Sequence, residues 1–446
     1  MAAQPTAVVS PGATAPAATH SGSVATTGRH RVVVFGVLLA VLAYVDRVAI
    51  AQAALPISAE LQLSRAQMGL IFSAFGLAYA LFEIPCGWLG DTFGPRRVLV
   101  RVVLWWSAFT AATGLAWSFW SLWTIRFLFG AGEAGCFPNL SKAFKSWLPQ
   151  SERSRAQGFL WAATRWGGAL TPLLFASALR FVTWRTAFTM LAAAGLVWCF
   201  FFYRWFADRP EDHPAVNSAE LALIKAGMPA TVSNVPIPWR RLVANRSVWL
   251  LSVQYFCLIF SWIFYITWLP TYLHDYHHQP AGAAARLAVI PLLFGGIGCM
   301  VAGFLVPRLA RILGSLAKAR RLLATTGLLG AACFLIVATR ITDPLICVLA
   351  LGAASFSNDL DTPPSWNAAM DVGGKYAGTV AGWMATGGHT AAVIAPTVGG
   401  YLLQRTHGDW NLFLYVMAVV FAAGALCWQF IDPVTSVEVG EYETVP

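Results

Sequence analysis

Charged residues are scarce in this 446-residue chain: Asp, Glu, Lys and Arg together make up 11% of it, against about 25% in an ordinary soluble domain. Hydrophobic residues make up 57%, and runs of about 20 predominantly apolar residues recur along most of the chain. A soluble protein of this composition would expose large apolar patches to water. In a bilayer the same surface faces lipid, so the composition predicts an integral membrane protein.

The sequence also lacks the motifs of common enzyme and metal classes. Its eight cysteines form no Cys-x-x-Cys pair and no Cys/His metal spacing, which argues against a zinc site or a disulfide framework. It has no Gly-x-Ser-x-Gly turn, no His-Glu-x-x-His helix and no Walker loop. We therefore expect a protein that is not an enzyme and that needs neither a cofactor nor a metal.

Both ends of the chain lack apolar runs. Residues 1–28 consist mainly of Ala, Pro, Thr, Ser and Gly, and such a composition cannot bury a core. We expect a disordered cytoplasmic tail here, and not a secretory signal peptide, because the apolar stretch of a signal is missing. Residues 432–446 are polar and acidic, and we expect a second cytoplasmic tail.

Twelve apolar segments follow one another between these tails. They lie at roughly 32–54, 66–89, 98–117, 119–142, 157–181, 186–206, 247–273, 284–310, 321–341, 344–368, 376–403 and 410–431. A polar stretch separates the first six from the last six. The pattern predicts an all-α membrane protein with twelve transmembrane helices: a six-helix half at 29–206, a cytoplasmic loop at 207–246 and a second half at 247–431. No strong residue-level repeat between the halves is evident.

The net charge of +10 has a simple explanation in such a protein. Cytoplasmic loops of membrane proteins accumulate Lys and Arg, so the charge gives no reason to expect nucleic-acid binding. If the N-terminus is cytoplasmic, the cytoplasmic loops receive most of the Lys and Arg residues. We therefore predict that both termini are cytoplasmic, that the protein lies in the cell's inner (plasma) membrane, and that it is a monomer.

The strongest local motif lies between the second and third segments. It reads Gly87-Trp-Leu-Gly-Asp91-Thr-Phe-Gly94-Pro-Arg96-Arg97. A glycine allows close contact between helices, and an acid in a basic turn can pair with arginines or with a neighbouring helix N-terminus. We interpret Gly87, Asp91, Gly94, Arg96 and Arg97 as a cytoplasmic gate. The alternative is a charged loop that only fixes the topology.

This stretch resembles the signature loop of the major facilitator superfamily. Three further stretches resemble its anion:cation symporter family: Tyr44-Val-Asp46-Arg47, Arg126-Phe-Leu-Phe-Gly-Ala-Gly-Glu133, and Asp208-Arg-Pro-Glu-Asp-His213. The resemblance covers residues 32–431 and implies the major facilitator fold and transport of sugar acids, other carboxylates or phosphate. The chain departs from the family at Pro307, where an acid is common, and at Thr164 and His389, where sugar-acid members carry Gln and Asn.

Charged residues inside the apolar segments need an explanation, because each costs about 2.5–3.5 kcal/mol to insert. They are Asp46, Arg47, Glu83, Arg126, Glu133, Arg165, Asp359 and Asp361. Arg126 and Glu133 are seven residues apart, so they share one face of a helix. Burial disfavours the charged form of a carboxylate and a nearby arginine favours it, so their balance can couple to protons. We expect Asp46 and Glu133 to carry protons, as the resemblance also implies; the alternative is a static network of ion pairs.

Other residues are candidates for binding the substrate. Arg47 and Arg126 can bind a carboxylate with two parallel hydrogen bonds, and the resemblance implies contacts from Tyr44, Arg47 and Tyr79. Thr164 is a further candidate. The remaining candidates are Arg165, Tyr265, Trp268, Trp383 and His389. The aromatic residues are as well explained by packing or by interfacial belts, and Arg165 by a cation that reaches the headgroups. Glu83 fits a gate network better than a proton site, and Asp359 and Asp361 fit a cavity wall or helix caps equally well.

These observations predict a proton-coupled symporter of a small organic anion of the hexonate, hexuronate or glucarate type. Its partners would be the anion, protons and the lipid bilayer. One alternative is an anion facilitator or exchanger of the same fold that moves no protons. A drug efflux pump is less favoured, because arginines inside the membrane do not suit cationic compounds.

Overall fold

The computed structural model describes residues 24–226 and 237–437, and every regular element in these ranges is helical. The predicted tail at residues 1–23 and the end of the second tail, at 438–446, lie outside the described residues. Seven of the helices in these described ranges are long and apolar enough to cross a membrane by length and composition alone. Others carry more polar residues or cross in two pieces.

The first half contains eight helices that correspond to the six expected segments. They are α1 (Gly28–Gln52), α2 (Ala54–Glu60), α3 (Arg65–Phe93), α4 (Pro95–Thr113), α5 (Phe119–Glu133), α6 (Cys136–Trp147), α7 (Gln150–Ala178) and α8 (Trp184–Trp205). The connection to the second half includes the short 3-10 helix η1 (Pro210–Asp212), α9 (Ser218–Lys225) and α10 (Trp239–Ala244).

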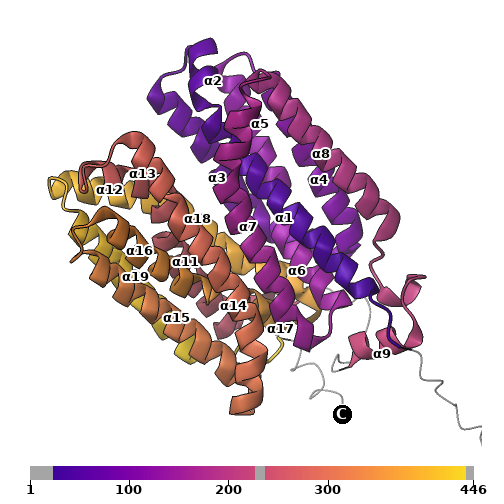
Figure 1. The fold of residues 1–446 in the computed structure, drawn as a ribbon. Helices are drawn as coiled ribbons and strands as arrows, with labels where there is room; N and C mark the ends of the chain where they lie inside the picture. Colours follow the sequence, from indigo (N-terminus) through magenta and orange to yellow (C-terminus); the bar gives the residue numbers. More distant parts are fainter. Residues whose placement is uncertain (1–23, 227–236, 438–446) are drawn as a thin grey trace, which may run out of the picture.

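The second half repeats this arrangement. Its elements are α11 (Arg246–Thr267), α12 (Leu269–Asp275), α13 (Ala281–Leu287), α14 (Val289–Leu313), α15 (Leu316–Ala338), α16 (Pro344–Asp359), α17 (Thr362–Gly373), the 3-10 helix η2 (Gly374–Tyr376), α18 (Ala377–Arg405) and α19 (Trp410–Phe430). The two halves lie side by side, the first from indigo to magenta and the second from orange to yellow (Figure 1). This is the two-half, all-α membrane fold that the sequence predicts.

Two of the expected spans that the structure divides occupy equivalent places in the two halves. The segment expected at 119–142 is split into α5 and α6, and the one expected at 344–368 into α16 and α17. Proline explains both breaks, because it has no N–H to donate to the preceding turn. Pro138 stands five residues after Glu133, and Pro364 stands five residues after Asp359. Each acid is the last residue of the first helical piece.

The halves touch through α3 with α18 and through α7 with α14. Both contacts use glycines where the backbones approach. A Cβ on Gly378 would lie 2.7 Å from the carbonyl oxygen of Gly87, and a Cβ on Gly158 would lie 2.8 Å from that of Cys299. Only glycine allows such close packing of two helices.

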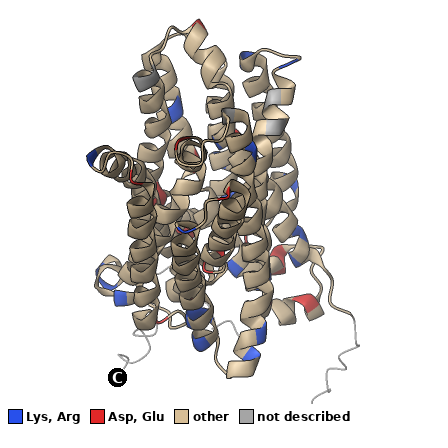
Figure 2. Ribbon diagram, turned by 60° about the vertical axis from the view of Figure 1, so that its left-hand side comes forward, with Lys and Arg blue, Asp and Glu red and all other residues tan. Residues whose placement is uncertain are grey.

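One end of the bundle carries both described ends of the chain and the connection between the halves. The backbone N–H of Arg29 donates to Glu220 of α9 at 2.9 Å, and Val437 N–H donates to the Val372 carbonyl at 2.9 Å. Lys and Arg gather toward this end in Figure 2. We call it the basic end; α2, α12 and α13 lie at the opposite end (Figure 1).

Candidate functional site

An arginine and a glutamate from different helices form a buried ion pair within the first half. Arg47 of α1 donates from Nε to Glu133 Oε1 of α5 at 2.6 Å. Glu133 is the last residue of α5, directly before the helix break. The Arg47 guanidinium also lies 4.5 Å from the ring centre of Tyr79 and 5.0 Å from that of Tyr44. The structure therefore brings four of the predicted residues together.

This pair leaves hydrogen-bonding capacity unused. Among the described residues, Glu133 Oε2 and Arg47 Nη2 are buried without a partner. The same holds for the hydroxyl of Tyr79. Buried polar atoms nearly always have partners, so a cluster of unsatisfied ones marks a place where a ligand, an ion or water binds.

Arg126 and Asp46 complete this cluster. Arg126 is 2% exposed and lies 4.2 Å from the ring centre of Phe129, while its Nε has no partner in the described part of the chain. Asp46 is 3% exposed, its Oδ1 is likewise unsatisfied, and it interacts electrostatically with both Arg126 and Glu133. The site thus holds two arginines with free donors beside two carboxylates with free oxygens. It can bind an anion, and it can hold protons on its acids.

A histidine of the second half reaches into this site. His389 of α18 stacks on Tyr79 of α3 with the ring centres 4.1 Å apart and an angle of 24°. Its Nδ1 lies 2.9 Å from Glu83 Oε2, also on α3. His389 and Glu83 therefore connect the two halves beside the Arg47 cluster.

Arg165 does not extend to the membrane surface. From α7 it donates Nε and Nη2 to both carboxylate oxygens of Asp359 in the second half, at 2.9 and 2.7 Å. Arg165 is 2% exposed, and the Asp359 side chain is fully buried. The Trp262 ring of α11 lies 4.3 Å from the guanidinium carbon. The structure thus favours an interior role for Arg165 over the headgroup alternative. Asp361, by contrast, is the N-cap residue of α17 and accepts from the Ser365 hydroxyl at 3.0 Å.

The other predicted binding residues are dispersed. Tyr265 is buried near Asp359, and its hydroxyl is unsatisfied among the described residues. Trp268 packs edge-on against Trp410, 6.1 Å away between ring centres. The Thr164 hydroxyl donates to the Trp161 carbonyl of its own helix.

Trp383 lies away from the Arg47 cluster. Its ring contacts Trp249, 5.2 Å away between centres, and Trp249 is 48% exposed on the outer surface. This position fits the packing explanation.

An aromatic stack that the sequence analysis did not single out lies between the two arginine pairs. Phe137 stacks on Trp161 at 4.9 Å and 23°, and Trp161 contacts Trp366 of the second half at 4.9 Å. The indole N–H of Trp366 donates to the Tyr255 hydroxyl at 3.1 Å. The repeated pattern of an acid, four residues and then a proline, at 133–138 and 359–364, was the available signal, because it marks both helix breaks.

The gate motif binds the other half at the basic end. Asp91 accepts hydrogen bonds from the N–H of Gly378 at 3.1 Å and of Thr379 at 2.7 Å, at the start of α18. It also pairs with Lys142 at 2.9 Å. An acid at a helix N-terminus is stabilised by the unpaired N–H groups and the helix dipole. The sequence suggested either arginines or a helix N-terminus as the partner of Asp91, and in the structure Asp91 binds the helix N-terminus.

The arginines of this motif have a different environment. Gly94 has φ +86°, and a Cβ there would collide with Asp208. Asp208 accepts from the Arg96 N–H at 2.7 Å, and the Arg96 side chain donates to the Tyr203 carbonyl at 2.6 Å. Arg97 is exposed and has no hydrogen bond or ion pair among the described residues. Arg96 therefore fastens the loop to the end of α8.

A second contact between the halves lies at the same end. Asp371 of α17 binds Arg153 of α7 at 3.1 Å and Arg320 of α15 at 2.7 Å. Asn367 donates to the Ser154 hydroxyl at 3.3 Å. The second-half copy of the gate loop has Pro307 in place of an acid. The ion pair between the halves is made instead by Asp371, a buried acid on α17. The halves are held together at the basic end on both sides.

Comparisons with known proteins agree with this architecture. The family model described as "Major Facilitator Superfamily" matches residues 36–396. The chain is 36% identical to a probable sulfoacetate transporter of Cupriavidus necator, over 92% of this chain and 95% of that protein. It is 29% identical to a probable L-galactonate transporter of Escherichia coli, over 88% and 86% of the two chains. The solved structure of the proton:xylose symporter XylE, bound to 6-bromo-6-deoxy-D-glucose, matches with a TM-score of 0.71 at 12% identity, covering 93% and 98%.

Proposed function

The chain belongs to the major facilitator superfamily, and from this premise we propose that it is a proton-coupled symporter of a small organic anion of the sugar-acid type. Relatives named as transporters of sulfoacetate, L-galactonate, hexuronate and galactarate or D-glucarate support a multi-pass transporter of organic anions. Proton coupling and the sugar acid itself are the further steps of the proposal.

The observation that carries the proposal is the Arg47–Glu133 pair with its unused hydrogen-bonding atoms. While Glu133 is ionised, it occupies the Nε of Arg47. A proton on Glu133 removes that competing charge, so Arg47 and the partly unsatisfied Arg126 can together bind a carboxylate. Binding of the anion and protonation of the acid therefore favour each other, which is the requirement for symport.

Asp46 supplies a second proton-binding group beside Arg126. With Asp46 and Glu133 neutral and the arginines occupied by substrate, the site carries little uncompensated charge. Such a site can be exposed in turn to each side of the membrane as the halves rock around it. In a cell with a membrane potential, each proton that enters contributes about 2.3 kcal/mol per 100 mV.

The Lys and Arg residues at the basic end support an orientation with that end in the cytoplasm of a bacterial-type plasma membrane. Contacts of Asp91 with α18 and of Asp371 with Arg153 then close the cytoplasmic face. In this conformation the substrate would enter from outside.

Proteoliposomes test the proposal directly. An inward proton gradient is imposed, and uptake is measured for a panel of hexonates, hexuronates, hexarates and sulfoacetate. We expect one or more of these acids to accumulate, the accumulation to collapse with an uncoupler, and Asp46→Asn and Glu133→Gln to abolish accumulation. Asp275→Asn, an exposed acid at the opposite end, is the matched control and should behave as the wild type.

Uptake that only equilibrates, at the same rate in Asp46→Asn and Glu133→Gln, would refute proton coupling. It would support an anion facilitator or exchanger of the same fold instead.

A further inference from the structure

The acids of the two acid–arginine pairs occupy equivalent places in the two halves, whereas both arginines belong to the first half. Glu133 ends α5 and binds Arg47, while Asp359 ends α16 and binds Arg165. In each case a proline five residues after the acid breaks the helix. The first pair lies within one half, but the second joins the two halves.

Both arginines border the same aromatic stack. The Arg47 guanidinium carbon lies 5.5 Å from the centre of Phe137, and that of Arg165 lies 6.0 Å from the centre of Trp161. The two rings stack on each other at 4.9 Å. Tyr44 also lies between the arginines, because it contacts Arg47 and interacts electrostatically with Arg165. A small molecule lying along Tyr44 and the stack would present one end to each arginine.

The residues around Asp359 leave space for its carboxylate and donate hydrogen bonds to it. A Cβ on Gly295 of α14 would overlap the Asp359 carboxylate and lie 2.8 Å from the Ser355 hydroxyl. The Thr362 hydroxyl donates to Asp359 Oδ1 at 3.1 Å. The charged and titratable groups that face Asp359 are Arg165 of α7, Tyr265 of α11, Cys299 of α14 and Asp361 before α17. Arg165 is the cation bound to Asp359.

From this arrangement we infer that the preferred substrate carries an anionic group at each end, and that its second group displaces Asp359 from Arg165 while Asp359 takes up a proton. This inference rests on the proposed function and names its substrate class: a dicarboxylate or a carboxylate–sulfonate. The first anionic group binds Arg47 and Arg126. The second takes the two-bond position on Arg165, and the proton comes from the same solution as the substrate.

The proton balances the charge of the exchange. Before binding, Arg165 and Asp359 neutralise each other; afterwards Arg165 is neutralised by the substrate. An ionised Asp359 would then be buried without a cation, which is costly, so the carboxylate binds H⁺ and becomes neutral. A substrate with two anionic groups is therefore carried with one proton more than a substrate with one. A monoanion leaves the Arg165–Asp359 pair closed.

The test compares matched substrates with the same number of carbon atoms. Glucarate carries two carboxylates and gluconate carries one; sulfoacetate and glycolate form a second such pair. The ratio of protons to substrate is measured in proteoliposomes from the reversal potential. In the wild type we expect the doubly charged member to move with one more proton than its partner, and Asp359→Asn to remove that additional proton.

Variants of both partners keep the inference testable if a single substitution harms folding. The double variant Arg165→Gln with Asp359→Asn has no uncompensated charge, and its folding is checked by size-exclusion chromatography. We expect the ratio of its uptake rate for the doubly charged substrate to that for the singly charged substrate to fall at least tenfold below the wild-type ratio. Equal proton ratios for both members of a pair in the wild type, with an unchanged uptake ratio in the double variant, would overturn the inference. The absence of any proton dependence for every substrate would instead refute the proposed function.

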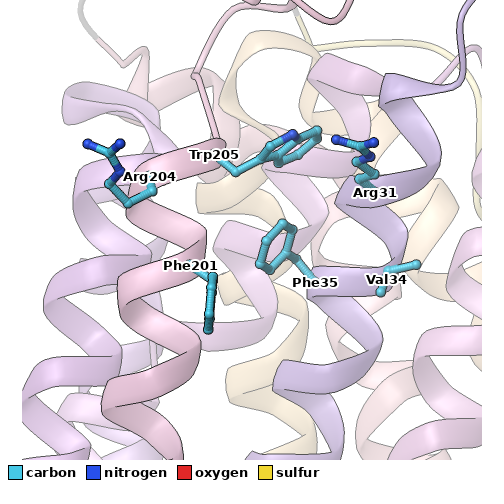
Figure 3. Close-up of a pocket in the computed structure, with 6 residues that line it drawn as sticks. All are labelled: Arg31, Val34, Phe35, Phe201, Arg204 and Trp205. Atoms are coloured by element: carbon cyan, nitrogen blue, oxygen red, sulfur yellow. The ribbon is translucent and has the colours of Figure 1, made fainter.

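A separate observation concerns the outer surface of the first half at the basic end. A groove of about 460 Å³ lies between α1 and α8, with Arg31 and Arg204 on its two sides and Trp205 between them (Figure 3). Below the arginines it is lined by Val34, Phe35 and Phe201. Val34 is 56% and Phe201 57% exposed, so this wall faces lipid in a membrane protein.

The polar groups at this groove lack partners. Neither Arg31 nor Arg204 makes a hydrogen bond or an ion pair with the described residues. The Trp205 indole stacks on Phe35 at 5.4 Å, and its N–H is buried without an acceptor in the same part of the chain. Three donors thus lie above an apolar wall at a membrane boundary.

We propose that this groove binds an anionic phospholipid, with the phosphate between Arg31 and Arg204 and an acyl chain along Val34 and Phe201. Basic pockets between transmembrane helices on the cytoplasmic side bind anionic headgroups in this way. The charge and the apolar wall together favour a lipid over a free anion, because a free anion would not need the wall.

Thermal unfolding of the purified protein tests this site. Added phosphatidylglycerol should raise Tm more than phosphatidylcholine does, and the double variant Arg31→Ala/Arg204→Ala should lose at least half of that difference. Arg308→Ala/Arg311→Ala removes two exposed arginines at the same end of α14 and should keep the full difference. An equal difference in both double variants would overturn the proposal. An equal rise with inorganic phosphate would show a free-anion site and also overturn it.

Discussion

A methyl group at Gly87 should open the basic end of this transporter. In Gly87→Ala the new Cβ would lie 2.8 Å from the carbonyl carbon of Gly378 and closer still to its oxygen. Both atoms belong to the backbone of α18, so no side chain can rotate away. The helices α3 and α18 must therefore separate.

The magnitude follows from the kind of clash. Inserting a methyl group into a well-packed contact costs about 1–3 kcal/mol. Because α3 and α18 touch here when the basic end is closed, the cost falls on the closed conformation and not on the open one. A change of 1–3 kcal/mol alters a two-state equilibrium by roughly 5- to 150-fold. We expect the population open at the basic end to rise by that factor.

Distances between spin labels provide the measurement. One label is placed in each half at the basic end, at Thr92→Cys and Arg311→Cys, both exposed positions, after the exposed Cys333 and the partly exposed Cys86 and Cys427 are replaced. Double electron–electron resonance then reports the populations of short and long distances. Gly87→Ala should increase the long-distance population.

Gly69→Ala is the matched control on the same helix, because a Cβ at Gly69 has no atom within 4 Å. It should leave the distance distribution unchanged. If Gly87→Ala gives the same distribution as Gly69→Ala and the wild type, then the α3–α18 contact does not hold the basic end closed.

Three further outcomes are expected. Asp91→Asn weakens the charge-assisted hydrogen bonds to the start of α18, each worth about 1.5–3 kcal/mol, so the same labels should report a larger open population; no change would indicate that Asp91 only fixes the topology. Glu83→Gln and His389→Asn should act non-additively on thermal unfolding, with a coupling of about 0.5–3 kcal/mol, whereas additive effects would mean that this pair does not join the halves. Burial raises the pKa of Glu220, but its hydrogen bonds from Arg29 and neighbouring groups outweigh burial and lower that pKa below the ordinary glutamate value. A carboxylate whose pKa is lower in the folded than in the unfolded protein stabilises the fold at pH values above its unfolded pKa, and this stabilisation is lost as the pH falls through its folded pKa. Hydrogen exchange should therefore show α9 docked at pH 5–8 and released below about pH 4. In Glu220→Gln, α9 should be released already at pH 7.

Several features of this protein are determined locally and could be predicted from the sequence alone. The scarcity of charge and the apolar segments fix a membrane protein of two six-segment halves, because the bilayer requires each span to be long and apolar. The buried charges at Asp46, Arg47, Arg126 and Glu133 were identifiable one by one, because each is costly in a membrane. A helix N-terminus was one of the two partners that the sequence of its loop suggested for Asp91.

The pairing of these residues depended on tertiary structure. Arg165 and Asp359 are joined by a two-bond ion pair across the halves, although one stood out as a possible headgroup contact and the other as a possible cap. Likewise, His389 was recognised as unusual, but its stacking on Tyr79 and its bond to Glu83 require α3 and α18 to meet. Trp383 lies on the same helix as His389, yet its ring contacts Trp249, which is 48% exposed.

The physical reason is that burial and helix length are properties of a single segment, whereas an ion pair is a property of two. Whether a segment enters the membrane follows from its own composition and its transfer free energy. Which face of it meets which partner follows from how the helices pack, and glycine contacts such as Gly87 with Gly378 set that packing. The composition of each segment therefore dictates which charges are buried in this protein, and the packing of the two halves dictates which of them neutralise one another.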